Sequence, residues 1–353
     1  MPQSERKHDL LVKIRYLQSH GRMRKKILIV TDNLRDQVNG VVVTYKNIEK
    51  CARDSGYDIV YIDPGQFRHI DCPGYPEVKL SWPKAMGEKI EALDPDYIHI
   101  ATEGPLGIAA RSYCRSRKLR YNTAYHTKFP EFLKAMYHIP VFLTYAYMRW
   151  FHRNSSKVIT TTSTMVEDLR AHGFKGNIVP WTRGIDRAVI SPTAPKEPNK
   201  DIEVLYVGRV SKEKNLDDLC RLQDRFNINI VGDGPYRSYL EQTYQKVTFH
   251  GYKQGSGLAD QFQRADVFAF PSCSDTFGIV IIEALSLGTP VAAYDVAGPK
   301  DIVQNGVNGF LGSDLESNIR NCLTLDRDQV KASSEQYTWQ RCWDIFEQNL
   351  VLV

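Results

Sequence analysis

Two acidic residues stand in the segment Pro271–Leu285, with seven residues between them. A predicted strand ends at the start of this segment, and a predicted helix begins near Phe277, capped by Asp275 or Thr276. Glu283 would then lie about two turns inside an apolar helix. A carboxylate there is costly unless it is hydrogen-bonded, and vicinal sugar hydroxyls are suitable donors. Alternatively, Asp275 is only a helix cap, and other protein groups bond Glu283.

Three basic residues lie in a turn predicted between a strand and a helix, in the run Val207–Asn215, and two of them are placed to bind phosphate. Arg209 follows Gly208, and Lys214 comes five residues later. Arg binds phosphate oxygens through two N–H groups and Lys acts as a point charge, so this pattern is typical of a diphosphate site. A basic surface turn would have the same sequence.

A glycine-rich turn, Val231–Pro235, follows the next predicted strand. Gly232 and Gly234 would let the backbone approach a nucleotide closely, because glycine carries no side chain. Such a pair of glycines is also common in plain turns, so the motif gains meaning only beside the other two.

Short runs rich in β-branched residues alternate with helical stretches from residue 23 onward, which predicts an α/β protein with parallel sheets covered by helices. In the first half the predicted strands are Lys26–Thr31, Asp58–Ile62, Tyr97–Ile100, Tyr121–Tyr125 and Val158–Thr161, and the predicted helices are Val43–Ser55, Met86–Leu93, Leu106–Arg117 and Thr164–His172. In the second half the strands are Glu203–Val207, Ile228–Val231, Val267–Phe270 and Val291–Ala293, and the helices are Leu216–Phe226, Tyr236–Gln245, Leu258–Arg264 and Val280–Leu287.

The alternation is interrupted by a proline-rich stretch that neither a helix nor a central strand would accept. We therefore expect an N-terminal appendage (1–22, with a short helix over Leu10–Gln18), a first doubly wound domain (23–185), a linker (186–200), a second doubly wound domain (201–335) and a C-terminal helix (336–353) that packs back on the first domain. Parallel sheets bind ligands at the carboxyl ends of their strands, so two such domains facing each other would form one cleft.

Taken together, these motifs resemble those of family-4 glycosyltransferases, which have the two-domain GT-B fold. The resemblance spans about residues 23–350 and is closest to the branch that contains bacterial mannosyl- and sulfoquinovosyl-transferases acting on diacylglycerol-type lipids. Besides the acidic pair, the Gly208–Asn215 turn and the Val231–Pro235 turn, it is carried by Ala284, Gly288, Thr289, Pro290, Asn39–Val41, Thr102–Gly107, His126–Glu131 and Arg183–Asp186.

The resemblance implies a role for each matching residue. Arg209 and Lys214 would hold the donor diphosphate, with Gly208, Gly232 and Gly234 allowing close approach, and Glu283 would bind the ribose hydroxyls. Asp275 and the backbone N–H groups of Thr276, Phe277 and Gly278 would orient the transferred sugar and the phosphate. Gly40 would let the first-domain loop close on the donor, and His126 would face the far hydroxyls of the sugar. Most of the family has Glu in place of Asp275, which leaves the sugar identity open.

Family members retain the anomeric configuration and need no metal, and the sequence agrees with the second expectation. Nine His residues are dispersed, and the Asp94-Pro95-Asp96 run lies between a predicted helix and a strand, where we interpret it as a turn. Seven scattered Cys residues lack CxxC spacing and indicate neither a zinc site nor a disulfide framework. We expect no cofactor beyond the nucleotide-sugar co-substrate.

The charge is distributed unevenly along the chain. Through residue 185 there are 29 Lys and Arg against 18 Asp and Glu, whereas the remainder is acidic. The first domain should therefore meet an anionic partner, and we expect its contacts to include Arg117, Lys118, Lys128 and Lys134. Aromatic residues between Phe129 and Trp150 would help if that partner is a lipid surface, or they are simply core.

No apolar run reaches the length of about 20 residues that a membrane span needs, and the chain does not begin with an apolar signal peptide. We expect a cytoplasmic protein, peripheral on the inner face of the membrane. The predicted activity is metal-independent, retaining transfer of a hexose-type sugar from a UDP- or GDP-sugar to a hydroxyl of a lipid or lipid-linked glycan. Two alternatives stay open: a phage-type enzyme that glycosylates a hydroxymethylated DNA base, and a catalytically silent protein that binds nucleotide sugars.

Overall fold

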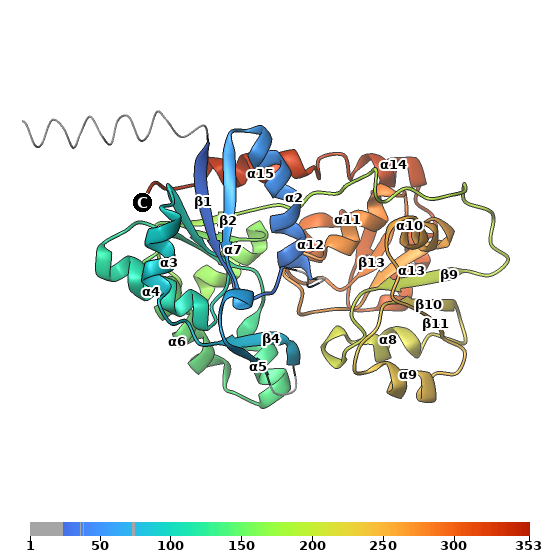
Figure 1. Cartoon of the computed structure of the whole chain (residues 1–353). Coiled ribbons are helices and arrows are strands. Elements are labelled where there is room, and N and C mark those ends of the chain that lie inside the picture. Colours follow the sequence, from blue (N-terminus) through green and yellow to red (C-terminus); the bar gives the residue numbers. More distant parts are fainter. Residues whose placement is uncertain (1–23, 36, 38, 73–74) are drawn as a thin grey trace, which may run out of the picture. The chain divides into compact units, whose positions relative to one another are not determined.

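The structure is a computed structural model that describes residues 24–35, 37, 39–72 and 75–353 (Figure 1). The predicted appendage and its short helix lie outside the described residues. The chain divides into two compact units. The first takes its described residues from Met1–Gln37, Tyr45–Asn122 and Leu350–Val353, and the second from Val38–Thr44 and Thr123–Asn349.

A six-stranded sheet carries the first half of the chain, in the strand order β2-β1-β5-β6-β7-β8. The strands are β1 (Lys25–Val30), β2 (Tyr57–Ile62), β5 (Tyr97–Ile100), β6 (Asn122–Tyr125), β7 (Val158–Thr160) and β8 (Ile178–Pro180). The helices of this half are α2 (Gly40–Asp54), α3 (Met86–Leu93), α4 (Pro105–Arg117), α5 (Phe129–Tyr137), α6 (Val141–His152) and α7 (Ser163–Ala171). An antiparallel hairpin of β3 (His69–Cys72) and β4 (Tyr75–Ser81) follows the short 3-10 helix η1 (Pro64–Gln66).

A second six-stranded sheet has the order β11-β10-β9-β12-β13-β14, and its described pairs are all parallel. Its strands are β9 (Glu203–Val207), β10 (Asn227–Val231), β11 (Thr248–Gly251), β12 (Val267–Phe270), β13 (Val291–Ala293) and β14 (Gly309–Leu311). The accompanying helices are η2 (Lys212–Lys214), α8 (Leu216–Cys220), α9 (Arg237–Thr243), α10 (Gly255–Arg264), α11 (Ile279–Ser286), α12 (Pro299–Ile302), α13 (Leu315–Cys322), α14 (Arg327–Ala332) and α15 (Trp339–Gln348). The prediction of two doubly wound parallel sheets is confirmed.

The strand order places the motifs of the second half together. Strand β9 lies between β10 and β12. The chain first adds β10 and β11 on one side of β9, and then adds β12, β13 and β14 on the opposite side. At such a switch point the loops after neighbouring parallel strands diverge and leave room for a ligand. The turns that follow β9, β10 and β12 therefore meet at one edge of the sheet.

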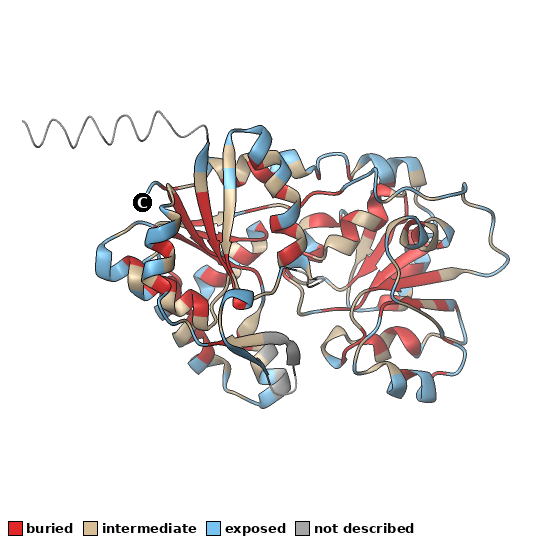
Figure 2. Cartoon of the chain, in the orientation of Figure 1, coloured by how far each residue is buried: buried red, intermediate tan, exposed pale blue. Residues whose placement is uncertain are grey.

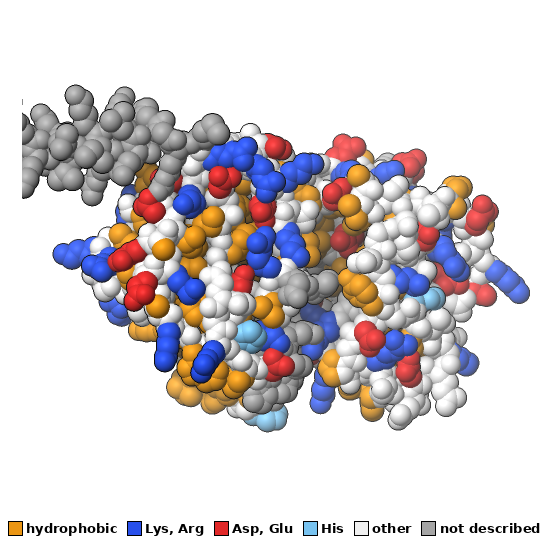
Figure 3. All heavy atoms as spheres, viewed as in Figure 1, with side chains coloured by type: hydrophobic (Ala, Val, Ile, Leu, Met, Phe, Trp, Pro, Cys, Tyr) orange, Lys and Arg blue, Asp and Glu red, His pale blue; other side chains and the backbone are white. Residues whose placement is uncertain are grey.

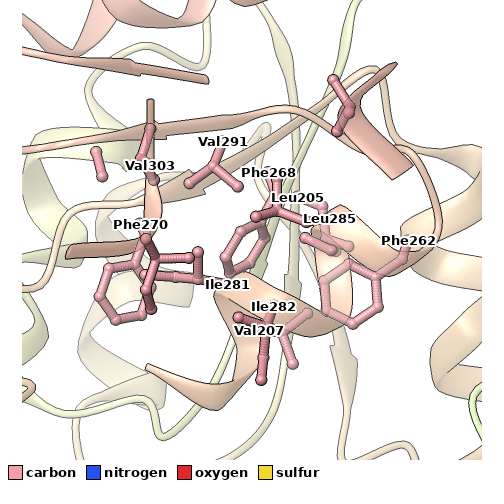
Figure 4. Close-up of a cluster of buried hydrophobic side chains, with 14 of the residues drawn as sticks. Leu205, Val207, Phe262, Phe268, Phe270, Ile281, Ile282, Leu285, Val291 and Val303 are labelled. Atoms are coloured by element: carbon pink, nitrogen blue, oxygen red, sulfur yellow. The ribbon is translucent and has the colours of Figure 1, made fainter. Parts of the chain in front are cut away.

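Buried apolar side chains hold this sheet against its helices, and the central strands of both sheets are buried (Figure 2). Around α11, side chains from the helix interleave with those of β9, β12 and β13 (Figure 4). Residues drawn there include Leu205, Val207, Phe268, Phe270, Ile281, Ile282, Leu285 and Val291. Because interiors are packed as densely as organic crystals, this cluster fixes the position of α11 and of the loop before it.

Several boundaries differ from the prediction. Helix α8 ends at Cys220, well before the predicted Phe226, because the backbone then changes to tighter turns in which Leu222 N donates to Leu219 O at 2.9 Å. Helix α2 begins at Gly40 and not at Val43, since the Asn39 carboxamide oxygen accepts from the N–H of Val42 at 2.9 Å. The hairpin β3–β4, helices α5 and α6, and the short strands β8, β11 and β14 were not predicted.

The predicted linker lies in a stretch, residues 181–202, without a helix or strand. Near the end of the chain, α15 packs against the start of this stretch: the indole Nε1 of Trp181 donates to Cys342 O at 2.7 Å, and its ring lies 5.0 Å from that of Phe346. Within the part of the chain that the structure describes, no helix is long and apolar enough to cross a membrane.

Candidate functional site

The turns after β9 and β10 are joined through their backbones. Gly208 N donates to Val231 O at 3.0 Å, and Val210 N donates to Asp233 O at 2.9 Å. Gly232 has a φ of 131°, and a Cβ at this position would collide with the Gly208 carbonyl oxygen. Glycine is therefore needed at position 232 both for its conformation and for the close approach of the two turns.

Lys214 forms an ion pair with Asp275. Its Nζ lies 2.8 Å from both carboxylate oxygens of Asp275, which comes from the loop after β12. Burial by itself raises the pKa of Asp275, but the charge and hydrogen bonds of Lys214 outweigh it and hold that pKa below its usual value. The structure thus brings together two residues that the sequence placed in separate motifs, and the carboxylate fixes the position of the ammonium group.

The same two segments are tied at a second point. Asn215, in the left-handed conformation with a φ of 52°, donates from Nδ2 to Pro271 O at 3.3 Å. Arg209 lies earlier on the turn, where its carbonyl oxygen accepts from the Tyr206 hydroxyl at 3.0 Å. Both predicted phosphate-binding cations therefore belong to a turn that is anchored to strand β9 and to the loop after β12.

The loop before α11 differs from the prediction. Helix α11 begins at Ile279, with Gly278 as its N-cap at a φ of 85°, so neither Asp275 nor Thr276 caps it. Their side chains have other partners: Asp275 binds Lys214, and the Thr276 hydroxyl donates to the carbonyl oxygen of His126 at 2.5 Å. Capping was the wrong interpretation because long-range partners compete with local backbone groups for short polar side chains.

Glu283 lies in the second turn of α11, between the buried Ile282 and Ala284. No hydrogen bond or ion pair to its carboxylate occurs among the described residues, and burial raises its pKa from 4.5 to about 7. A half-buried carboxylate without a protein donor is suited to accept hydrogen bonds from a ligand. This favours the ligand-binding interpretation over the alternative of a carboxylate bonded by the protein.

Two predicted residues approach the same loop from the first half of the chain. His126 follows β6, and its backbone is bonded to Thr276 as described above. Gly40 starts α2, and a Cβ added there would lie 3.7 Å from Cδ1 of Ile279, the first residue of α11. The Phe277 side chain is buried in the core, 6.2 Å from the ring of Tyr337, so only its backbone is available to a ligand.

Two residues near this loop were missed by the sequence prediction. The Thr161 hydroxyl donates to Thr276 O at 2.6 Å, and a guanidinium N–H of Arg183 lies 3.1 Å from Nδ1 of His126. Arg183 was part of a quoted motif but received no role. The sequence feature that could have pointed to Arg183 is a basic residue directly before a glycine, in a segment with no predicted helix or strand.

The predicted surface cations have different surroundings. Lys134 and Lys118 are exposed, and Arg117 is exposed and 3.1 Å from Glu91. Lys128, in contrast, has a side chain only 15% exposed, with Nζ 3.9 Å from Asp168. It is therefore less available to an external partner than the sequence indicated.

The described residues contain no group of three or more His, Cys, Asp or Glu side chains that could hold a metal ion. The Asp94-Pro95-Asp96 run is a turn as predicted, because Asp94 ends α3 and a carboxylate oxygen of Asp96 accepts from Lys26 N at 2.7 Å.

Two family models match the chain in succession. The model described as Glycosyltransferase Family 4 covers residues 38–189, and the model described as Glycosyl transferases group 1 covers residues 190–317.

Relatives of known activity match most of the chain. A sulfoquinovosyl transferase of Arabidopsis thaliana is 27% identical over 92% of this chain and 72% of its own length. A GDP-mannose-dependent alpha-mannosyltransferase of Mycobacterium tuberculosis is 28% identical, over 81% of this chain and 83% of its own. An alpha-monoglucosyldiacylglycerol synthase of Streptococcus pneumoniae is 27% identical over 76% of this chain and 71% of its own.

Solved structures share the fold. Sucrose-phosphate synthase of Thermosynechococcus elongatus has a TM-score of 0.75 at 19% identity, covering 92% of this chain and 98% of that one. HepE of Anabaena, solved with UDP and glucose, has a TM-score of 0.69 at 17% identity, covering 92% and 99%. With the two family models spanning residues 38–317 between them, the chain belongs to the family-4 glycosyltransferases, which have the GT-B fold.

Proposed function

We propose that this glycosyltransferase moves a hexose-type sugar from a UDP- or GDP-sugar to a hydroxyl of a lipid or lipid-linked glycan, with retention of the anomeric configuration. The observation that carries the proposal is the combination of a positioned cation and an unengaged carboxylate at one sheet edge. Lys214 is held by Asp275 in the loop before α11, and Glu283 lies two turns further along, with no donor to its carboxylate among the described residues. A nucleoside diphosphate presents the matching groups, negative phosphates and ribose hydroxyls.

The chemistry follows from these positions. The bond between the sugar and the diphosphate breaks, and Arg209 and Lys214 stabilise the negative charge that develops on the departing phosphate. Cations fixed before the reaction are effective because no reorganisation is needed as charge develops. The acceptor oxygen attacks from the same face and forms the new bond to the sugar, its proton passes to the departing diphosphate, and Asp275 and His126 orient the sugar. Since side chains supply the positive charge, the proposed reaction uses no metal.

The acceptor is proposed from the relatives and from the surface of the first half. One relative is named for a diacylglycerol product, and a second for sulfoquinovosyl transfer. Phe142 in α6 is 70% exposed, and Leu143, Tyr137 and Trp150 are also exposed. Figure 3 shows hydrophobic side chains gathered on the surface over α6, with Lys and Arg side chains beside them. Such a mixture suits attachment to the cytoplasmic face of an anionic membrane.

Not all the aromatic residues of this segment belong to that surface. Tyr145 is buried, with its ring stacked on His172 at 3.8 Å and its hydroxyl donating to Glu131 at 2.8 Å. The side chains of Phe132 and Met136 lie outside the described residues. The core interpretation therefore applies to Tyr145, and the proposed lipid contact is confined to the exposed residues of the segment.

To test this, the purified protein is incubated with labelled UDP-sugars or GDP-sugars. Two acceptors are supplied in parallel reactions, a lipid extract and hydroxymethylated duplex DNA. We expect label in the lipid phase with one donor, and at least tenfold slower labelling with the Lys214→Ala variant. Label in DNA alone would replace the lipid proposal with DNA modification, for which the basic first half would supply phosphate contacts. Donor binding without transfer to either acceptor would favour the silent binding protein.

A further inference from the structure

His126 and Arg183 lie at the ends of strands in the same sheet. His126 follows β6 and Arg183 comes shortly after β8, with β7 between the two strands. Both side chains are buried: His126 is 9% exposed and Arg183 only 3%. The Nη2 atom of Arg183 lies 3.1 Å from Nδ1 of His126.

This hydrogen bond can have only one direction. A guanidinium has N–H donors and no acceptor, so Nδ1 of His126 must accept and carry no proton. A neutral imidazole has one N–H, which then lies on Nε2. Protonation of Nδ1 would break the bond and place two cations about 3 Å apart, which a buried site opposes.

We propose that Arg183 is a positioning residue that makes His126 a hydrogen-bond donor through Nε2 and prevents it from acting as a base. To accept the acceptor's proton, His126 would need a bare Nε2 and a proton on Nδ1, the form that Arg183 excludes. This inference rests on the proposed function, in which His126 contacts the sugar. It assigns His126 the role of donating to a sugar oxygen and leaves proton removal to another group.

Arg183 is itself held in place, as a positioning residue must be. Its Nη1 donates to the carbonyl oxygens of Trp181 at 2.8 Å and Thr182 at 3.0 Å, and its guanidinium carbon lies 4.6 Å from the centre of the Trp181 ring. The backbone next to Arg183 packs closely against Trp339. A Cβ on Gly184 would lie 2.6 Å from Cα of Trp339, so glycine is needed for this approach. Burying a guanidinium is costly, and these contacts offset part of that cost.

The His126–Arg183 pair also contacts the loop before α11. The His126 carbonyl oxygen accepts from the Thr276 hydroxyl, and the Arg183 guanidinium carbon lies 5.9 Å from the centre of the Phe277 ring. Thr276 thus holds the backbone of His126, and Arg183, which lies near Phe277, holds its ring. Thr276 and Phe277 belong to the same loop as Asp275. A change at Arg183 should alter the imidazole without moving the Lys214–Asp275 pair.

NMR spectroscopy determines directly which ring nitrogen of His126 carries the proton. Two-bond ¹H–¹⁵N NMR spectra of protein labelled with ¹⁵N-histidine, with His126 assigned from the His126→Asn variant, should show a protonated Nε2 and a bare Nδ1. In Arg183→Met this preference should be lost, whereas Arg183→Lys, which keeps a cationic donor, should restore it. A proton on Nδ1 in the wild type, or an unchanged tautomer in Arg183→Met, would overturn the inference.

Kinetics supply the second readout. We expect Arg183→Met to lower kcat/KM about tenfold, the scale of one hydrogen bond. Nucleoside diphosphate affinity should stay unchanged, which also verifies that the variant is folded. If the wild type transfers no sugar, the proposed function fails while the NMR result still stands. If it transfers sugar with the proton on Nδ1, only the inference fails.

Discussion

Replacing Glu283 with Gln should make the protein more stable at alkaline pH and weaken its binding of the donor. The carboxylate lies inside α11 with no partner among the described residues, and burial raises its pKa from 4.5 to about 7. The folded protein therefore holds this proton more tightly than the unfolded chain does. Glutamine has nearly the same shape and no charge, so it removes the cost of burying the ionised group.

The size and sign of this change in stability follow from the pKa values of Glu283 in the unfolded and folded protein. A carboxyl group that titrates at 4.5 when unfolded and at about 7 when folded costs up to about 3 kcal/mol of stability once it is ionised. Because the folded pKa is the higher one, this cost grows as pH rises from 4.5 to 7 and is complete above that window. Glu283→Gln should thus raise the free energy of unfolding by up to about 3 kcal/mol at pH 8, and hardly at all at pH 4.

Urea unfolding of both proteins at pH 4, 6 and 8 measures the stability, and calorimetry with UDP and GDP measures the binding. Glu88→Gln, an exposed glutamate in α3, serves as the matched control and should alter neither. Donor affinity should fall at least tenfold in Glu283→Gln, because an amide accepts less well from two ribose hydroxyls. Equal stability at pH 8 together with equal affinity would refute the reasoning and indicate that protein groups satisfy Glu283.

Four further outcomes are expected. Vesicle co-sedimentation should rise with anionic lipid, fall with salt and weaken in Lys134→Glu; binding that ignores salt would contradict an electrostatic contact. Excess EDTA should leave turnover intact, and a complete loss restored by magnesium or manganese would show that a metal is needed. Gly232→Ala should lower the melting temperature by several degrees, since a Cβ there meets the Gly208 carbonyl oxygen. Asp275→Asn should reduce kcat, because Lys214 loses the anion that holds it; an unchanged kcat would remove that role.

The parallel sheets were predictable because their central strands are continuous apolar runs between helical segments. Residues such as Ile27–Val30 are buried on both faces of a sheet, which requires apolar side chains at every position. The strands that were missed are short or polar. Thr248–Gly251 is an edge strand with no fully buried residue, so its sequence resembles a loop.

The residue types of the candidate site were predictable, and their partners were not. Lys214 and Asp275 are 61 residues apart, and nothing local shows that the ammonium group of one meets the carboxylate of the other. The same holds for Arg183 and His126, whose contact depends on the order of three strands. Local patterns report helices, strands and turns, whereas pairing between distant side chains is decided by topology and packing.

The central claim is that Arg209 and Lys214 stabilise the departing diphosphate, and turnover in their alanine variants tests it most directly. With whichever donor and acceptor support transfer, kcat should fall at least tenfold in Arg209→Ala and in Lys214→Ala, which corresponds to a loss of about 1.4 kcal/mol of transition-state stabilisation. Circular dichroism should match that of the wild type in both variants, whereas Lys214→Ala should also lower the melting temperature, because it leaves the Asp275 carboxylate without its cation. A wild-type kcat in either folded variant would contradict the account.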